Sequence, residues 1–101
     1  MRVVINRCFG GFSISLKAAQ YMAAKGSKAA LAALRQKHFY GDIYGDDRTN
    51  PLLVEAVEAL GKEADGSVAE LKVVEIPDGV DFEIDDYDGM ESIHERHRSW
   101  G

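Results

Sequence analysis

The amino-acid sequence predicts an α+β fold in which helices cover a mostly antiparallel sheet. Three observations support this prediction. Runs rich in β-branched residues, at 3–5 and 71–76, have the composition of strands. Apolar residues recur at helical spacing between those runs. Glycine and proline turns separate the segments, which gives the expected order β-α-α-β-α-β-β-α.

A chain of 101 residues is expected to form a single domain, residues 1–101. Its net charge of −5 argues against general binding of DNA or RNA. Its longest apolar run is far shorter than the ~20 residues that span a membrane, and its first residues lack the apolar core of a signal peptide. The lone Cys8 suits a reducing compartment, so we expect a cytoplasmic protein with no membrane partner.

Charge is divided unevenly along the chain. Residues 1–48 carry eight Lys or Arg against three acids, and residues 49–101 carry four against fourteen. Halves of +5 and −10 suggest surfaces that face each other within the monomer or between subunits. We therefore expect a homo-oligomer, a dimer at least. The alternative interpretation is that both surfaces are simply solvated.

The first strand, at 2–8, leads into the stretch that carries most functional information. Asn6 and Arg7 stand at its carboxyl end, and Gly10-Gly11 lets the backbone turn before a serine caps the next helix. A strand, a glycine turn and a helix N-terminus together present backbone N–H groups to an anion. The sequence leaves open whether this is an anion site or only a structural turn.

Three helices follow from spacing and capping residues. The first is expected at 15–25 and the second at 27–36, each beginning at a serine. Asn50 as cap and Pro51 at the first helical position open the third, which ends near Gly61.

Three later strands are predicted. One lies at 38–44. The other two, at 70–76 and 80–86, flank the turn sequence Pro77-Asp78-Gly79 and are expected to pair with each other as a hairpin.

The C-terminal segment is predicted to be a helix. Asp88 and Glu91 have the spacing of a capping box, and apolar residues follow on one stripe: Met90, Ile93, His97 and Trp100. On that helix Glu91 and Glu95 form a like-charge pair one turn apart, for which Arg7 is the expected partner. A solvated helix face is the alternative.

The candidate ligand-binding residues are arginines near turns, which can grip phosphate, together with the glycine turn and aromatic rings that can stack on a base. They are Asn6, Arg7, Phe9, Gly10, Gly11, Arg48, Tyr87 and Arg98. We predict no catalytic residue, no metal and no cofactor.

The sequence resembles a family of small phage and prophage proteins, and the shared segments cover both ends of the chain. These segments are Val4–Phe12, Arg48–Leu52, Leu71–Asp78, Tyr87–Glu91, Glu95, His97–Arg98 and Trp100. Members of the family often have a longer stretch between the first helix and the Arg-Thr segment, where this sequence is short.

The size and the combination of arginine with aromatic residues are also similar to the Thoeris anti-defence sponges. Those phage proteins form oligomers and sequester cyclic nucleotide signals of bacterial immunity without cleaving them. This resemblance implies a non-enzymatic protein in the host cytoplasm that binds a cyclic nucleotide or a cyclic ADP-ribose-like molecule.

Two other functions stay open at this point. An acidic surface, comprising Asp81, Glu83, Asp85, Asp86 and Asp88, could inhibit a host enzyme by mimicking nucleic-acid charge. A small metal-dependent hydrolase using Glu91, His94 and Glu95 is the third hypothesis, although their spacing is not the zincin pattern.

Overall fold

The computed structural model describes residues 1–35 and 48–95. In chain order the elements are β1 (Arg2–Asn6), α1 (Leu16–Ala24), α2 (Lys28–Leu34), α3 (Pro51–Leu60), a 3-10 turn (Gly61–Ala64), β2 (Leu71–Glu75), β3 (Phe82–Tyr87) and β4 (Met90–Glu95). The α+β class is confirmed, with two antiparallel pairs of strands. The strand expected at 38–44 lies outside the described residues, as do His97, Arg98 and Trp100.

The three helices begin where the capping residues predict. The hydroxyl of Ser15 accepts the N–H of Ala18, and Ser27 caps α2 in the same way. The side chain of Asn50 accepts the N–H of Leu52, with Pro51 at the first helical position of α3. Each cap satisfies an N–H that has no partner within the helix, so these starting points follow from local chemistry.

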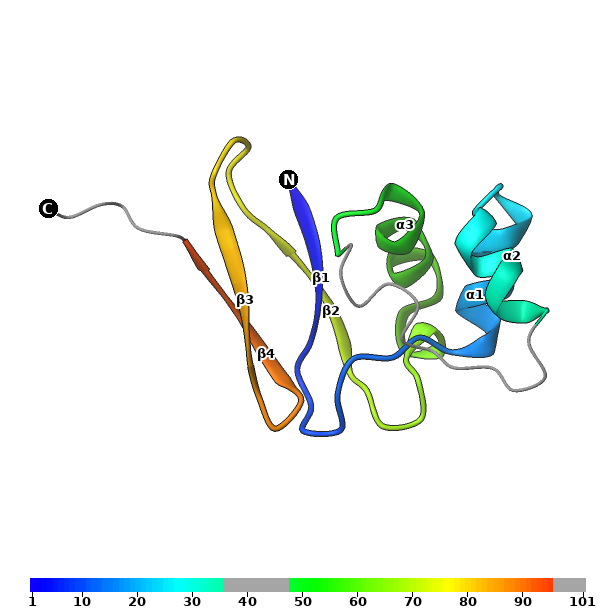
Figure 1. The fold of residues 1–101 in the computed structure, drawn as a ribbon, viewed down its shortest axis with the longest axis horizontal. Coiled ribbons are helices and arrows are strands. Elements are labelled where there is room, and N and C mark those ends of the chain that lie inside the picture. Colours follow the sequence, from blue (N-terminus) through cyan, green and yellow to red (C-terminus); the bar gives the residue numbers. More distant parts are fainter. Residues whose placement is uncertain (36–47, 96–101) are drawn as a thin grey trace, which may run out of the picture.

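Strands β1 and β2 form the middle layer of the molecule (Figure 1). They pair antiparallel with Val3 opposite Val74 and Val4 opposite Val73. Val4 lies in the hydrophobic core with residues of α1 and α3, and Val73 packs against that core. Because side chains alternate along a strand, this face of the pair belongs to the helical layer.

The second hairpin, β3–β4, lies on the other side of β1–β2 from the helices (Figure 1). Val3 and Ile5, which alternate with Val4, are 0% and 4% exposed. Ile5 and Val74 line a hollow together with Ile93 of β4, so this face of β1–β2 is turned toward the hairpin. β1 is therefore covered on both faces, which explains its continuous run of buried β-branched residues.

The predicted C-terminal helix is wrong, because β4 (Met90–Glu95) is a strand paired with β3. Asp88 and Gly89 have positive φ angles of 51° and 91°, the conformation of a two-residue hairpin turn. The N–H of Gly89 donates to the carboxylate of Asp86 at 2.7 Å. A helix cap needs a negative φ, so the Asp-Gly pair turns the chain back instead of starting a helix.

The predicted pairing of 70–76 with 80–86 is also wrong, although residues 78–79 do form a turn. β2 pairs with the first strand of the chain, and the N–H of Ile76 donates to the carbonyl of Met1 at 2.8 Å. The amino group of Met1 also donates to Asp78 at 2.6 Å, and this hydrogen bond lowers the pKa of the Asp78 carboxyl. The turn therefore carries the chain from one layer to the next.

The close approach of two turns can be tested at Gly89. A Cβ at this position would lie 2.4 Å from the amide nitrogen of Gly11 and 2.6 Å from the carbonyl oxygen of Phe9. Gly79 also has a positive φ, of 80°, but nothing lies within 4 Å of its Cβ position. Gly79→Ala should therefore show only the conformational cost of roughly 1 kcal/mol. We expect Gly89→Ala to lower the melting temperature at least twice as much as Gly79→Ala, and equal losses would contradict this packing.

Candidate functional site

The outer edge of β1, opposite β2, is closed by two contacts from distant parts of the chain. The N–H of Val4 donates to the carbonyl of Arg48 at 2.9 Å. The N–H of Asn6 donates to the carboxylate of Glu91 at 2.8 Å. Buried backbone N–H groups need partners, and among the described residues these two contacts supply them where no strand pairs with this edge.

Arg48 and Glu91 form a buried bidentate ion pair at this edge. The two guanidinium nitrogens lie 2.5 and 2.7 Å from the carboxylate oxygens. Arg48 is 8% exposed and Glu91 is 4% exposed. The guanidinium also lies 3.7 Å from the centre of the Phe12 ring, a cation–π contact. Arg48 is therefore part of the scaffold, and its expected role as a ligand arginine is corrected.

The partner expected for Glu91 is corrected as well. Arg7 contacts Glu91 through the backbone carbonyl, to which its Nη1 donates at 2.5 Å, whereas the carboxylate belongs to Arg48. Strand geometry explains the difference, because it turns the Glu91 side chain toward β1 and leaves its carbonyl in the plane of the sheet. Arg7 itself is exposed.

Asn6 is fully buried and is used by the scaffold. Its amide nitrogen donates to the carbonyls of Cys8 and Gly89, each at 2.6 Å. Its carbonyl oxygen accepts the N–H of Glu70 at 2.8 Å. One side chain thus joins three loops, and we assign it to structure instead of ligand binding.

The Gly10-Gly11 turn is a packing joint between the same loops. A Cβ on Gly10 would lie 1.9 Å from the carbonyl oxygen of Val68, so only glycine fits there. Gly11 has a φ of 92°. The turn does not lead directly into α1, because Ile14 first forms an isolated bridge with Asp65. The glycines thus have a structural role at this turn, whatever else its N–H groups bind.

Phe9 and Tyr87 meet at the end of the molecule where these loops converge. Their rings are 6.4 Å apart and inclined at 70°, an edge-to-face pair. Phe9 is 60% exposed and Tyr87 is 73% exposed, and Val68 behind Gly10 is 55% exposed. We call Phe9, Val68 and Tyr87 the apolar tip.

A hollow of about 270 Å³ between β1–β2 and β4 gathers the exposed cations of this region. Arg7 comes from the end of β1, and Lys72 comes from β2, where it is paired with Ile5. Ser92 of β4 also lines the hollow, and apolar side chains form the floor. The lining residues are Ile5, Arg7, Lys72, Val74, Ser92 and Ile93, and we call this site the basic hollow.

Sequence reasoning found Arg7 but missed Lys72. The available signal was a lysine inside the apolar strand Leu71-Lys72-Val73-Val74. Its face is identified only by the register with β1, which sets Lys72 beside Ile5 and not beside Val4. The hydrogen bond to the Glu91 carbonyl orients the guanidinium of Arg7, and a planar guanidinium has further N–H donors for an anion.

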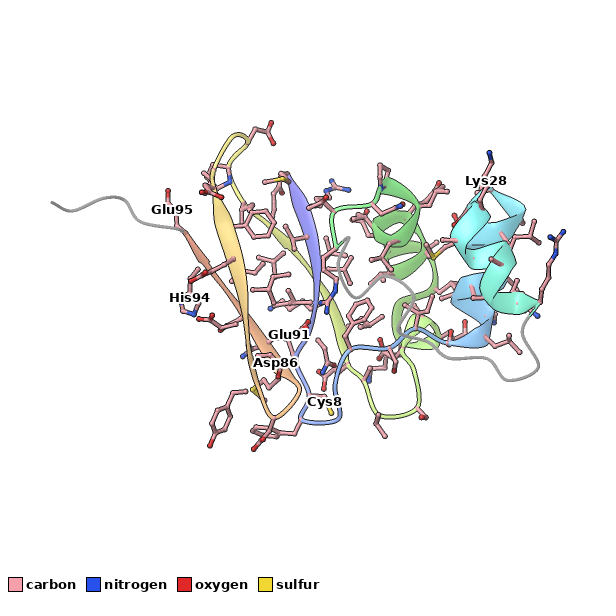
Figure 2. The ribbon with its side chains drawn as sticks, in the orientation of Figure 1. Cys8, Lys28, Asp86, Glu91, His94 and Glu95 are labelled. Atoms are coloured by element: carbon pink, nitrogen blue, oxygen red, sulfur yellow. The ribbon has the colours of Figure 1, made fainter. Side chains whose placement is uncertain are left out.

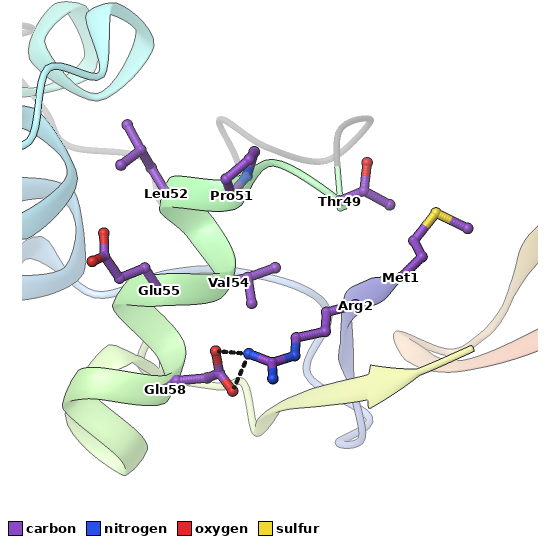
Figure 3. A pocket seen from close by; sticks show the side chains of 8 residues that line it. All are labelled: Met1, Arg2, Thr49, Pro51, Leu52, Val54, Glu55 and Glu58. Carbon is purple, nitrogen blue, oxygen red and sulfur yellow. Dashed lines mark hydrogen bonds and ion pairs between the residues drawn. The ribbon is translucent and has the colours of Figure 1, made fainter. Parts of the chain in front are cut away.

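A larger hollow, of about 620 Å³, lies beside α3 and has a different charge (Figure 3). Arg2 points into it and contacts the carboxylate of Glu58 at 2.8 Å. Glu55 also lines it. Arg2 is paired with Glu58 and the amino group of Met1 is paired with Asp78, so this hollow offers an anion less than the basic hollow does.

Ser92, His94 and Asp85 approach one another on the outward face of the β3–β4 hairpin. The Nε2 atom of His94 lies 3.2 Å from the hydroxyl of Ser92 and 2.9 Å from the carboxylate of Asp85. A catalytic triad needs the serine and the carboxylate on opposite ring nitrogens, whereas both are on one nitrogen here. The geometry is that of an exposed ion pair with a neighbouring hydroxyl.

The residues of the metal-hydrolase hypothesis do not come together. Alternation along β4 puts Glu91 on the face turned toward β1 and His94 on the opposite face (Figure 2). Within residues 1–35 and 48–95, no group of three or more metal-binding side chains is present. The acidic residues Glu83 and Asp85 lie on the exposed outward face with His94.

Searches against protein-family models, curated proteins and solved structures found no match to this chain. Among the helices that the structure describes, none is long and apolar enough to cross a membrane.

The buried ion pair predicts a large loss of stability on Glu91→Gln. The amide oxygen can still accept the N–H of Asn6, but Arg48 is left as an uncompensated buried charge, which costs roughly 3–5 kcal/mol. At about 4–8 °C per kcal/mol, the melting temperature should fall by more than ten degrees. Adding Arg48→Met to Glu91→Gln should recover part of the loss.

The control for this experiment is Glu58→Gln, which breaks the exposed pair with Arg2. Exposed pairs contribute about 0–1 kcal/mol, so little change is expected. Similar melting curves for Glu58→Gln and Glu91→Gln would show that the buried pair is not a main support of the fold.

Proposed function

We propose that this chain is a non-enzymatic binding protein for a phosphate-bearing small molecule, held in the basic hollow by Arg7 and Lys72. The observation that carries the proposal is the meeting of two exposed cations over an apolar floor. The cyclic nucleotide signals suggested by the resemblance to the Thoeris anti-defence sponges are the first ligands to test.

The physical basis is complementary charge at a partly desolvated site. The guanidinium of Arg7 can give two parallel hydrogen bonds to a phosphate, and Lys72 adds a point charge. The apolar floor of Ile5 and Ile93 limits screening by water, which strengthens both contacts. Of the described residues that line the hollow, none is a histidine, cysteine or carboxylate, which supports sequestration without cleavage.

The test of this proposal is binding followed by recovery of the ligand. The purified protein is incubated with cyclic dinucleotides, cyclic trinucleotides and cyclic ADP-ribose isomers, and is then denatured by heat. Intact ligand in the supernatant supports sequestration, whereas a cleaved product makes the protein an enzyme. Absence of binding to every phosphate-bearing probe, inorganic phosphate included, would overturn the proposal.

Arg7→Ala should abolish or strongly weaken phosphate binding while changing the melting temperature little, because Arg7 is exposed and its side chain donates to a backbone carbonyl instead of a buried charge. The matched control is Arg35→Ala, which removes an exposed arginine at the end of α2, away from the hollow. Titration calorimetry and melting curves on both variants are the measurements. If both variants bind equally well, Arg7 is not a ligand residue.

The proposal includes self-association through the apolar tip. Phe9, Val68 and Tyr87 are large apolar side chains, each more than half exposed, gathered at one end of the molecule. Light scattering should therefore return a dimer or larger at micromolar concentration, and Phe9→Ser with Tyr87→Ser should return the monomer of 11.1 kDa. Leu31→Ser, at another exposed apolar position, is the control. A monomeric wild-type chain would contradict this part of the proposal.

A further inference from the structure

The basic hollow continues into a second hollow of about 380 Å³, because Val74 and Ile93 line both. The second hollow extends between β2 and the β3–β4 hairpin toward the turn at residues 78–79, which connects β2 to β3. Its lining is almost entirely apolar, and we call it the apolar groove. The lining residues are Val74, Ile76, Pro77, Val80, Phe82, Ile93 and Glu95.

We infer that the two hollows form one cleft and that its occupant is a small amphiphilic anion. The anionic head lies on Arg7 and Lys72, and an aliphatic body extends past Val74 and Ile93 to Phe82. This inference rests on the anion site of the proposed function and names the class of ligand which that site takes.

The packing of the two strand pairs supports an occupant in the groove. Phe82, Ile93 and Val74 face one another across the layers, yet each is only half-buried. The opposite face of β1–β2 packs into the hydrophobic core, in which Val4 is fully buried. A volume of about 380 Å³ lies within the usual range for small-molecule sites, so an alkyl chain of medium length can fill it.

The chemistry of the lining distinguishes an alkyl body from a nucleobase. The edge of a base carries donors and acceptors that lose hydrogen bonds to water when they are buried among aliphatic side chains. In the described lining of the groove, Glu95 at the far end is the single charged side chain. The cleft therefore favours a phosphate or carboxylate with an alkyl substituent over a nucleotide that contacts only the basic hollow.

The test compares octyl phosphate, octanoate, inorganic phosphate and octyl glucoside by titration calorimetry on the full chain, below micelle-forming concentrations. Octyl phosphate should bind at least tenfold more tightly than inorganic phosphate, and the neutral glucoside should bind weakly or not at all. Equal affinity for octyl phosphate and inorganic phosphate would overturn the proposed role of the apolar groove in binding an alkyl chain, while the anion site would stand. If octanoate binds as tightly as octyl phosphate, the site accepts carboxylate and phosphate head groups alike, which supports the inferred class of amphiphilic anions.

Variants then separate the two parts of the cleft. Val80 lies in the loop before β3, and Val80→Ser should lower the affinity for octyl phosphate several-fold and leave the affinity for inorganic phosphate unchanged. Leu31→Ser is the matched control, since Leu31 is an exposed apolar residue on α2. Lys72→Gln should lower the affinity for both anions, and Lys28→Gln on α2 is its control. Octyl glucoside binding as tightly as octyl phosphate would show a nonspecific apolar surface and overturn the inference, and no binding of any anion would overturn the proposed function with it.

Discussion

The structure depends on the buried ion pair between Arg48 and Glu91. The two residues are 43 positions apart, and together they close the edge of β1 that β2 does not cover. A chain of this size has room for one modest core, which the helices and one face of β1–β2 already form. The second hairpin is attached to β1 by polar contacts at the strand edge, where Glu91 accepts from both Arg48 and Asn6.

This mode of attachment explains why a cleft exists. Glu91 fixes one end of the hairpin against β1 through its carboxylate, and Asn6 fixes the turn at Gly89. Farther along, the apolar side chains of β2, β3 and β4 face one another with space between them. Two strand pairs that are joined at one end leave hollows between them along the rest of their length.

The same residue connects the scaffold to the proposed site. The carboxylate of Glu91 binds Arg48, while its backbone carbonyl accepts a hydrogen bond from Arg7. The ion pair thus holds the strand that orients Arg7, the arginine that we propose binds the anion. Two arginines near β1 look equivalent in the sequence, but burial divides them: Arg48 supports the fold, and Arg7, which is exposed, is available to an anion.

The sequence by itself determined the features that depend on neighbours a few residues apart. The caps at Ser15, Ser27 and Asn50 each act within three positions, so the helices begin where expected. The Asp88-Gly89 turn also depends on near neighbours. Because Asp88 and Glu91 have capping-box spacing, the sequence predicts a helix there, whereas the positive φ angles are those of a hairpin turn.

Only the tertiary structure decided which strands pair and which cations stay exposed. β2 could pair with β3 or with β1, and Glu91 could meet Arg7 or Arg48, because charge and strand propensity are the same for either partner. The choice rests on contacts up to 85 positions apart, such as that between Asn6 and Glu91. Burial selects among such partners only when the layers are assembled, and no local pattern encodes it.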